Sequence, residues 1–146
     1  MRRVEQGMLY VLVPYDPAWP DLFEALRGDI VALTGLSRGC IHHIGSTAVR
    51  GLSAKPIIDI QVGVPDLDAF DLSRLSGRGF APAPEIDRDD PFPDERAGYG
   101  GWRKKYARLE RDNRRLAHVH VRQMGAPNYR FALLMRDYLR HSEMAR

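Results

Sequence analysis

A glycine-serine turn and a later aspartate have the residue types that could bind a phosphate and a divalent metal. The turn is Gly45, Ser46 and Thr47, and twelve residues separate Ser46 from Asp59. Such a turn lets backbone N–H groups and a hydroxyl approach a phosphate closely, and a short helix beginning at Thr47 would add its positive end. Asp59 could then hold Mg²⁺ against the phosphates, with Lys55 as a further positive charge. The plainer alternative is a tight turn without a ligand and a carboxylate paired with Lys55.

Two histidines that alternate with valines form a second candidate group, at His118 and His120. In an extended strand both imidazoles lie on one face, about 7 Å apart. They could complete a metal site with Asp59, or bind phosphate when protonated. Half-exposed strand histidines without a ligand are the alternative. We therefore predict Asp59, His118 and His120 as metal ligands, while His43, beside the glycine-serine turn, either caps the turn or faces the cleft.

A basic segment precedes the two histidines. Seven basic residues stand against two acidic ones, Glu110 and Asp112; the basic ones are Arg103, Lys104, Lys105, Arg108, Arg111, Arg114 and Arg115. If the strand face of Arg103 and Lys105 lines the cleft, we expect these two residues to bind a ligand phosphate. The alternative is that the whole basic segment is a hairpin exposed to solvent. Nucleic acid is the weaker expectation, because few aromatic residues interleave the charges. The acidic segment 85–90 is predicted to be an exposed loop, with donation of a metal ligand as the alternative.

Hydrophobic periodicity predicts the elements that must position these residues. Alternating or continuous apolar residues predict strands, the first of them short and buried, over residues 8–13, 40–44, 57–64, 102–109 and 116–123. Helical spacing and capping residues predict three helices: from Asp16 and Pro17 to Gly35, from 65–66 to Gly77 or Gly79, and from a cap at Asn128. Residues 81–101 are expected to be irregular. The expected architecture is an α/β domain with a mixed sheet of about five strands and helices packed on it.

Length and composition fit one domain, residues 1–146. The chain has 44% hydrophobic and 28% charged residues, so disordered and low-complexity classes are excluded. The net charge of +3 is too small for obligate coating of a polyanion. One cysteine, Cys40, excludes an internal disulfide and fits a reducing cytoplasm. No apolar run approaches the roughly 20 residues needed to span a bilayer, so no membrane segment is expected.

The residues around Ser46 and Asp59 resemble the nucleotidyltransferase superfamily, whose motif is Gly followed by Gly or Ser, a spacer of this length, and an Asp-apolar-acidic triplet. Gln61 stands in place of the second acidic residue, which puts two-metal catalysis in doubt. A closer resemblance is to the GrpB (UPF0157-type) family. It rests on the segments 13–20, 43–49, 51–52, 54–60, 118–121 and 131–140.

The resemblance implies a nucleotidyltransferase-like fold and Mg²⁺-dependent transfer of a nucleotidyl group from an NTP to a small acceptor. Ser46 and Asp59 would be the catalytic residues, and Gly45, Thr47 and Lys55 would help bind the nucleotide. The alternative is a domain that binds a nucleotide or a CoA-like ligand, or a chaperone-like accessory domain, without catalysis. The final helix of relatives is longer, so apolar residues near Leu133, Leu134 and Tyr138 are expected to be partly uncovered, and a homodimer is expected to cover them.

Overall fold

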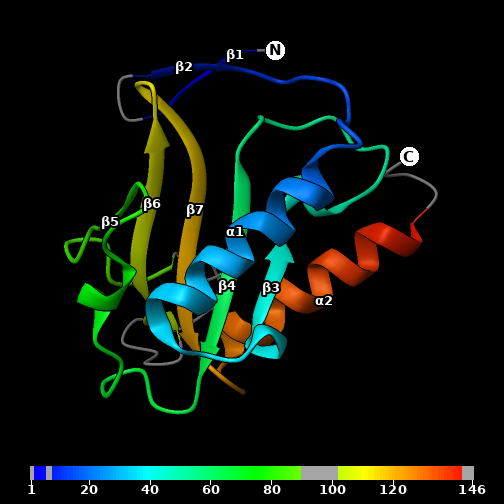
Figure 1. Cartoon of the computed structure of the whole chain (residues 1–146). Coiled ribbons are helices and arrows are strands. Elements are labelled where there is room, and N and C mark those ends of the chain that lie inside the picture. The colour runs from blue at the N-terminus through cyan, green and yellow to red at the C-terminus, as the bar shows by residue number, and fades with distance from the viewer. Residues whose placement is uncertain (1, 6–7, 90–101, 143–146) are drawn as a thin grey trace.

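The computed structural model describes residues 2–5, 8–89 and 102–142 (Figure 1). Its main sheet has five strands in the order β3-β4-β7-β6-β5. The bounds are β3 (Ile41–Ile44), β4 (Ile58–Val64), β5 (Phe80–Pro82), β6 (Lys105–Arg111) and β7 (Arg114–Gln123). The central pair β4 and β7 is parallel and the other pairs are antiparallel. The predicted mixed sheet of about five strands is therefore confirmed.

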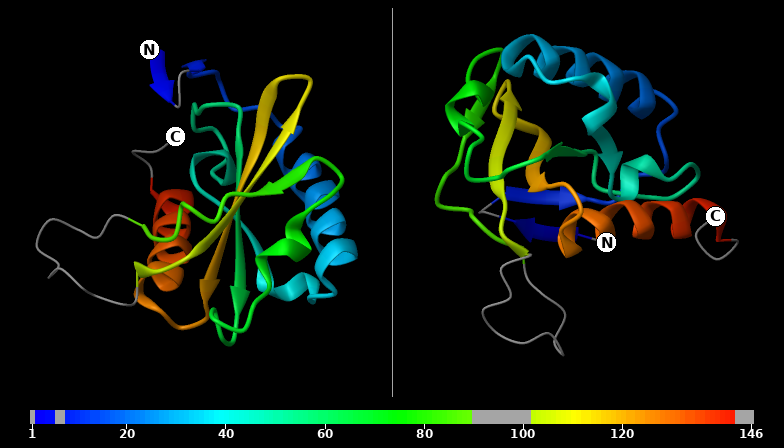
Figure 2. Two further views of the ribbon diagram at one scale, coloured as in Figure 1. Left: turned by 90° about the vertical axis from the view of Figure 1, so that its left-hand side faces the viewer. Right: turned by 90° about the horizontal axis from the view of Figure 1, so that it is seen from below.

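Two helices cover opposite faces of this sheet. Figure 2 shows α1 (Trp19–Thr34) on one side of the strands and α2 (Pro127–His141) on the other. Strands β1 (Arg2–Glu5) and β2 (Met8–Val11) form a separate antiparallel pair. Three short 3-10 helices connect the larger elements: η1 (Arg38–Cys40), η2 (Ser46–Ala48) and η3 (Leu72–Leu75). No described helix is long and apolar enough to cross a membrane.

Helix α1 forms because apolar residues recur on one of its faces. Phe23, Leu26 and Ile30 are buried against the sheet, as predicted from their helical spacing. The helix ends at Gly35, whose positive φ of 74° suits a glycine at this position. Asp16 accepts a hydrogen bond from the N–H of Ala18 at 2.8 Å, so it supports the turn before the helix instead of capping it.

Three predicted elements differ from the structure. The first strand ends at Val11 and lies outside the main sheet, and Val11 is 46% exposed, so the prediction of a buried strand over 8–13 was wrong. The helix predicted from residue 65 is wrong except for η3. Asp66 and Asp71 each accept a backbone N–H two residues ahead, and such local turns compete with helix formation. Part of the segment predicted to be irregular is strand β5, and residues 90–101 of that segment lie outside the described ranges.

The strands predicted over 102–109 and 116–123 form a hairpin, and its turn is shorter than the segment 110–115 between them. β6 and β7 run on to Arg111 and Arg114, and only Asp112 and Asn113 connect them. Both connecting residues have positive φ, 53° and 61°, as in the two-residue turns that match the twist of antiparallel strands.

Helix α2 begins at Pro127, with Ala126 as its N-cap, so the predicted cap at Asn128 was wrong. The helix lies close to β4 because Gly63 has no side chain there. A Cβ on Gly63 would stand 2.7 Å from the ring of Tyr129. On the outer side of α2, Leu134 and Tyr138 are 63% and 67% exposed, as the sequence predicted for this surface.

Candidate functional site

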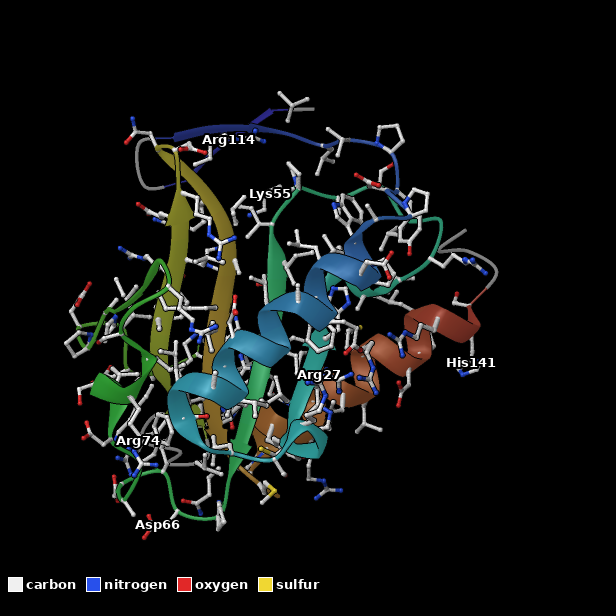
Figure 3. All side chains as sticks on the ribbon, viewed as in Figure 1. Arg27, Lys55, Asp66, Arg74, Arg114 and His141 are labelled. Carbon is white, nitrogen blue, oxygen red and sulfur yellow. The ribbon has the colours of Figure 1, made fainter. Side chains whose placement is uncertain are left out.

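The sheet face opposite α1 carries a row of polar side chains. Asp59 and Gln61 on β4 stand beside His118 and His120 on β7, since the parallel register pairs 59 with 118 and 61 with 120. A cavity of about 520 Å³ opens over this row, and its lining includes Ser46, Thr47, Lys55, Asp59, Lys104, Tyr106, His118 and His120. Figure 3 places Lys55 just before β4, near the end of the sheet that β1 and β2 cross. The structure therefore brings the predicted turn, lysine, aspartate and histidines together.

Gly45 permits the close approach of the turn to Asp59. Its φ is 74°, a conformation that side-chain-bearing residues rarely adopt. A Cβ at this position would lie 2.6 Å from Oδ2 of Asp59. The glycine thus places the backbone of the turn directly against the carboxylate, while η2 is only three residues long and supplies no substantial helix dipole.

Asp59 is the carboxylate of this cavity, and His120 orients it. Nε2 of His120 lies 3.4 Å from Oδ1 of Asp59, and Nδ1 of His120 lies 3.1 Å from Nζ of Lys104. An ammonium group only donates, so Nδ1 must accept and the proton of the neutral imidazole must be on Nε2, where it is donated to Asp59. Lys104 therefore selects the tautomer in which His120 donates to the carboxylate.

The charge states follow from burial and from these contacts. Burial lowers the pKa of His120 to about 4 against the opposing effect of its hydrogen bond to Asp59, so the imidazole is neutral at pH 7. Burial alone would raise the pKa of Asp59, but the hydrogen bond from His120 and the charge of Lys55 bring it below its usual value. At neutral pH the cavity contains an ionised carboxylate.

His118 has a different partner. Its Nδ1 bonds to the hydroxyl of Tyr106 across the β6–β7 pair. The imidazole rings of His118 and His120 lie 6.2 Å apart, on one face as predicted. Burial raises the pKa of Tyr106, which keeps its hydroxyl protonated. The two histidines therefore have different hydrogen-bond partners.

Gln61, which stands two residues after Asp59 on the same strand face, has a structural role. Gln61 is fully buried, its Oε1 accepts from Arg122 at 2.8 Å and its Nε2 donates to the carbonyl of Tyr129 at 3.2 Å. Among the described residues, no group of three or more His, Cys, Asp or Glu side chains is arranged to hold a metal ion. Asp59 could serve as the protein ligand of one Mg²⁺ whose other ligands are water and phosphate oxygens. The set of Asp59, His118 and His120 as metal ligands stays a prediction.

Asp89 has a role that the sequence did not reveal. Its carboxylate, 15% exposed, accepts from Lys104 at 2.8 Å, from Arg122 at 2.9 Å and from Asn128 at 2.9 Å. Burial would raise the pKa of Asp89, but these donors lower it far below its usual range. The prediction of an exposed loop over 85–90 was wrong at Asp89, which joins the start of α2 to β7, and residue 90 lies outside the described residues. The sequence signal for such a partner was that basic residues at positions 104 and 122 point to the polar face of their strands without an acidic residue near them in sequence.

Two predicted phosphate contacts lie elsewhere. Arg103 pairs with Asp68 at the surface, and Nζ of Lys105 donates to the carbonyl of Phe70. Neither lines the cavity, because strand alternation turns Lys104 and Tyr106 toward it and Lys105 away.

A contact between Thr47 of the turn and His43 before it holds the turn in place. Thr47 is 2% exposed, and its hydroxyl lies 2.9 Å from Nε2 of His43. The His43 ring stacks on Phe23 of α1, with ring centres 4.8 Å apart. His43 therefore fastens the turn, the first of its two expected roles, and does not line the cavity.

Comparisons with known proteins place the chain among its relatives. The family described as "GrpB protein" matches residues 10–146. A dephospho-CoA kinase of Mycobacterium tuberculosis is 36% identical over 92% of this chain, and a UPF0157 protein of Pseudomonas aeruginosa is 38% identical over 92%. The chain spans 36% of the first relative and 52% of the second.

A solved structure has the same fold. The conserved protein GrpB from Enterococcus faecalis superimposes with a TM-score of 0.69 and 29% identity, over 92% of this chain and 74% of that one. The family match covers nearly the whole chain, and the structural match extends to the sheet and both helices. This chain belongs to the GrpB family.

Proposed function

We propose that this domain binds a phosphate-bearing small molecule, a nucleotide or a CoA-like ligand, in the cavity beside Ser46 and Asp59. The observation that carries the proposal is the lining of that cavity. Lys55, Lys104 and the hydroxyl of Ser46 face a space of about 520 Å³, the size of a typical small-molecule site. Lys104 is already paired with Asp89, so the ammonium group of Lys55 is the charge of the lining that favours an anionic ligand.

Relatives supply the choice of probe. Some are named dephospho-CoA kinase, and this chain covers 36% of their length. We therefore take ATP, CoA and dephospho-CoA as the ligands to test first, each with and without Mg²⁺. Asp59 would accept a hydrogen bond from a ligand hydroxyl, or hold Mg²⁺ against the phosphates.

The test is isothermal titration calorimetry with matched lysine variants. Lys55→Ala removes a cation of the cavity, and we expect it to weaken phosphate-ligand binding at least tenfold. Lys105→Ala removes a lysine on the opposite strand face, outside the cavity, and should leave the affinity unchanged. Equal effects of the two variants, or no binding of any of the three ligands by the wild-type protein, would contradict the proposal.

Nucleotidyl transfer is a second candidate, favoured by the ionised Asp59 beside Ser46. In that reaction an acceptor oxygen attacks the α-phosphorus of an NTP and pyrophosphate leaves. Bound Mg²⁺ would neutralise phosphate charge in the transition state. Gln61 weighs against it, because its amide is held by Arg122 and cannot serve as a second carboxylate.

Pyrophosphate release separates the two candidates. A transferase should release pyrophosphate in an Mg²⁺-dependent manner, and Asp59→Asn should abolish the release. A binding domain should release none, and Asp59→Asn should keep ligand affinity within a few-fold.

A further inference from the structure

A second cavity lies on the other side of Asp59, between α2 and the sheet. It measures about 410 Å³ and shares Ser46, Asp59 and His120 with the first cavity. The two spaces therefore meet at the carboxylate. Figure 2 shows α2 lying along one part of this face of the sheet.

The wall of the second cavity is mainly apolar. Phe131, Ala132, Met135 and Leu139 line it from successive turns of α2, and Trp102 faces them. Such a wall suits an apolar or aromatic body, and phosphate is better accommodated by the lysines of the first cavity. The two cavities thus differ in the chemistry that they would bind.

The charged floor of the second cavity is already paired. Asp89 accepts from three different side chains, and Arg122 donates both to Asp89 and to Gln61. Arg136 donates to Asp137 and to the carbonyl of His43. These contacts hold the floor in place and leave little of its charge for a ligand.

At the end that the two cavities share, the carboxylate of Asp59 can accept a hydrogen bond from a ligand. The side chain of Asp59 is 32% exposed, and of its two oxygens Oδ1 takes the hydrogen bond from His120. A carboxylate has about four acceptor sites, so it can accept from a ligand as well. A ligand group that donates a hydrogen bond, a hydroxyl or an amine, fits this end.

We infer that the second cavity binds a small molecule with an apolar body and a hydroxyl or amine that donates to Asp59. This inference rests on the proposed function, because it assigns the phosphate-bearing ligand to the first cavity and a second ligand to this one. The two ligands would meet at Ser46, Asp59 and His120, the residues that both cavities share.

The experiment uses three fragments of one shape: 2-phenylethanol, phenethylamine and ethylbenzene. Saturation-transfer NMR on the whole chain measures their affinities. In the wild-type protein, 2-phenylethanol should bind at least threefold and phenethylamine at least tenfold more tightly than ethylbenzene. In Asp59→Asn the advantage of the charged amine should fall about tenfold, since a charge-assisted hydrogen bond is lost. An unchanged amine advantage would overturn the inference.

A pair of variants on one helix locates the site. Ala132→Phe fills the second cavity, while Leu134→Phe adds a similar volume on the exposed side of α2. We expect Ala132→Phe to weaken fragment binding at least fivefold and Leu134→Phe to leave it unchanged. Circular dichroism confirms that both variants fold, and equal fragment affinities in the two folded variants would overturn the inference.

Titration of the same variants with ATP and CoA separates this inference from the proposed function. Ala132→Phe should keep the wild-type affinity for the phosphate ligand, which lies in the other cavity. Fragment binding that responds to Ala132→Phe in a protein that binds neither ATP nor CoA would support the second cavity and contradict the proposed function. If ATP or CoA binds but fragment binding is unchanged in Ala132→Phe, the result would support the proposed function and contradict the second cavity.

Discussion

The two faces of the central sheet are built from the same strands but stabilised in different ways. On the α1 face, Ile60 and Val119 are fully buried among other apolar side chains. One residue along β4, on the α2 face, Gln61 is equally buried but bonds to Arg122 and to a backbone carbonyl. One face is stabilised by burial of apolar surface, and the other requires a partner for each polar group.

This difference explains where the site lies. An apolar face tolerates exchange of one hydrophobic residue for another if volume is kept. A polar face is specific, because a missing partner leaves a buried group unsatisfied. Where α2 covers the polar face, Asp89 and Arg122 satisfy each other. Asp59 lies where the cavity against α2 meets the first cavity, and there it can meet a ligand.

The largest expected effect is on the apolar face. Ile60→Ala should lower the free energy of unfolding by about 4 kcal/mol, because it removes buried methyl groups and leaves a cavity. Leu134→Ala, on the exposed surface of α2, should change it by less than about 0.5 kcal/mol. Urea unfolding followed by circular dichroism measures both. Similar losses in the two variants would show that the α1 face is not the main source of stability.

The next effect is on the polar face. Asp89→Ala should cost about 3 kcal/mol, since it leaves Lys104 and Arg122 as buried charges without their carboxylate. Asp68→Ala breaks an ion pair with Arg103 at the surface and should not change the urea midpoint measurably. If Asp89→Ala is as stable as the wild-type protein, the polar face contributes less to folding than its contacts indicate.

Acid should weaken the protein through its buried histidines. Burial lowers the pKa of His43 to about 4, below its unfolded value of 6.5, so protons bind the unfolded chain more tightly. Stability is therefore full above pH 6.5 and falls as the pH falls toward 4, by on the order of 2 kcal/mol between pH 7 and 4.5 for this histidine. The pKa of His120 is also lowered by burial, so its protonation likewise reduces stability as the pH falls.

Unfolding curves at several pH values measure this effect. His43→Gln keeps a hydrogen-bonding group beside Thr47 but does not titrate. The variant should lose the contribution of His43 and show a shallower fall in stability between pH 6.5 and 4. An unaltered slope would mean that His43 is not the residue responsible.

The smallest expected effect concerns the tautomer of His120. Lys104→Met removes the ammonium that donates to Nδ1, so the pKa of His120 should rise from about 4, and the preference for a proton on Nε2 should weaken. Lys105→Met, on the apolar side of β6, should change neither. Nitrogen NMR of the imidazole reads both quantities directly, and identical spectra for wild type and Lys104→Met would show that Lys104 does not orient His120.

Local sequence patterns were sufficient for several parts of this molecule. Helical spacing in α1 placed Phe23, Leu26 and Ile30 in the core, and Gly35 marked the end of the helix. Alternation placed Asp59 and Gln61 on one face of β4. These features depend on residues a few positions apart, so periodicity and capping preferences are enough to predict them.

Tertiary structure decided the rest. Lys104 lines the cavity and Lys105 does not. A shift of one residue in the strand would exchange their two sides, and hydrophobic periodicity does not fix the register at the end of a strand. Asp89 meets Arg122 across 33 residues, and β4 pairs with β7 across more than 50 residues. Contacts between residues so far apart in sequence cannot be predicted from the spacing of neighbouring residues. The sequence therefore determined which residues could do chemistry, while the pairing of distant strands determined which of them share a site.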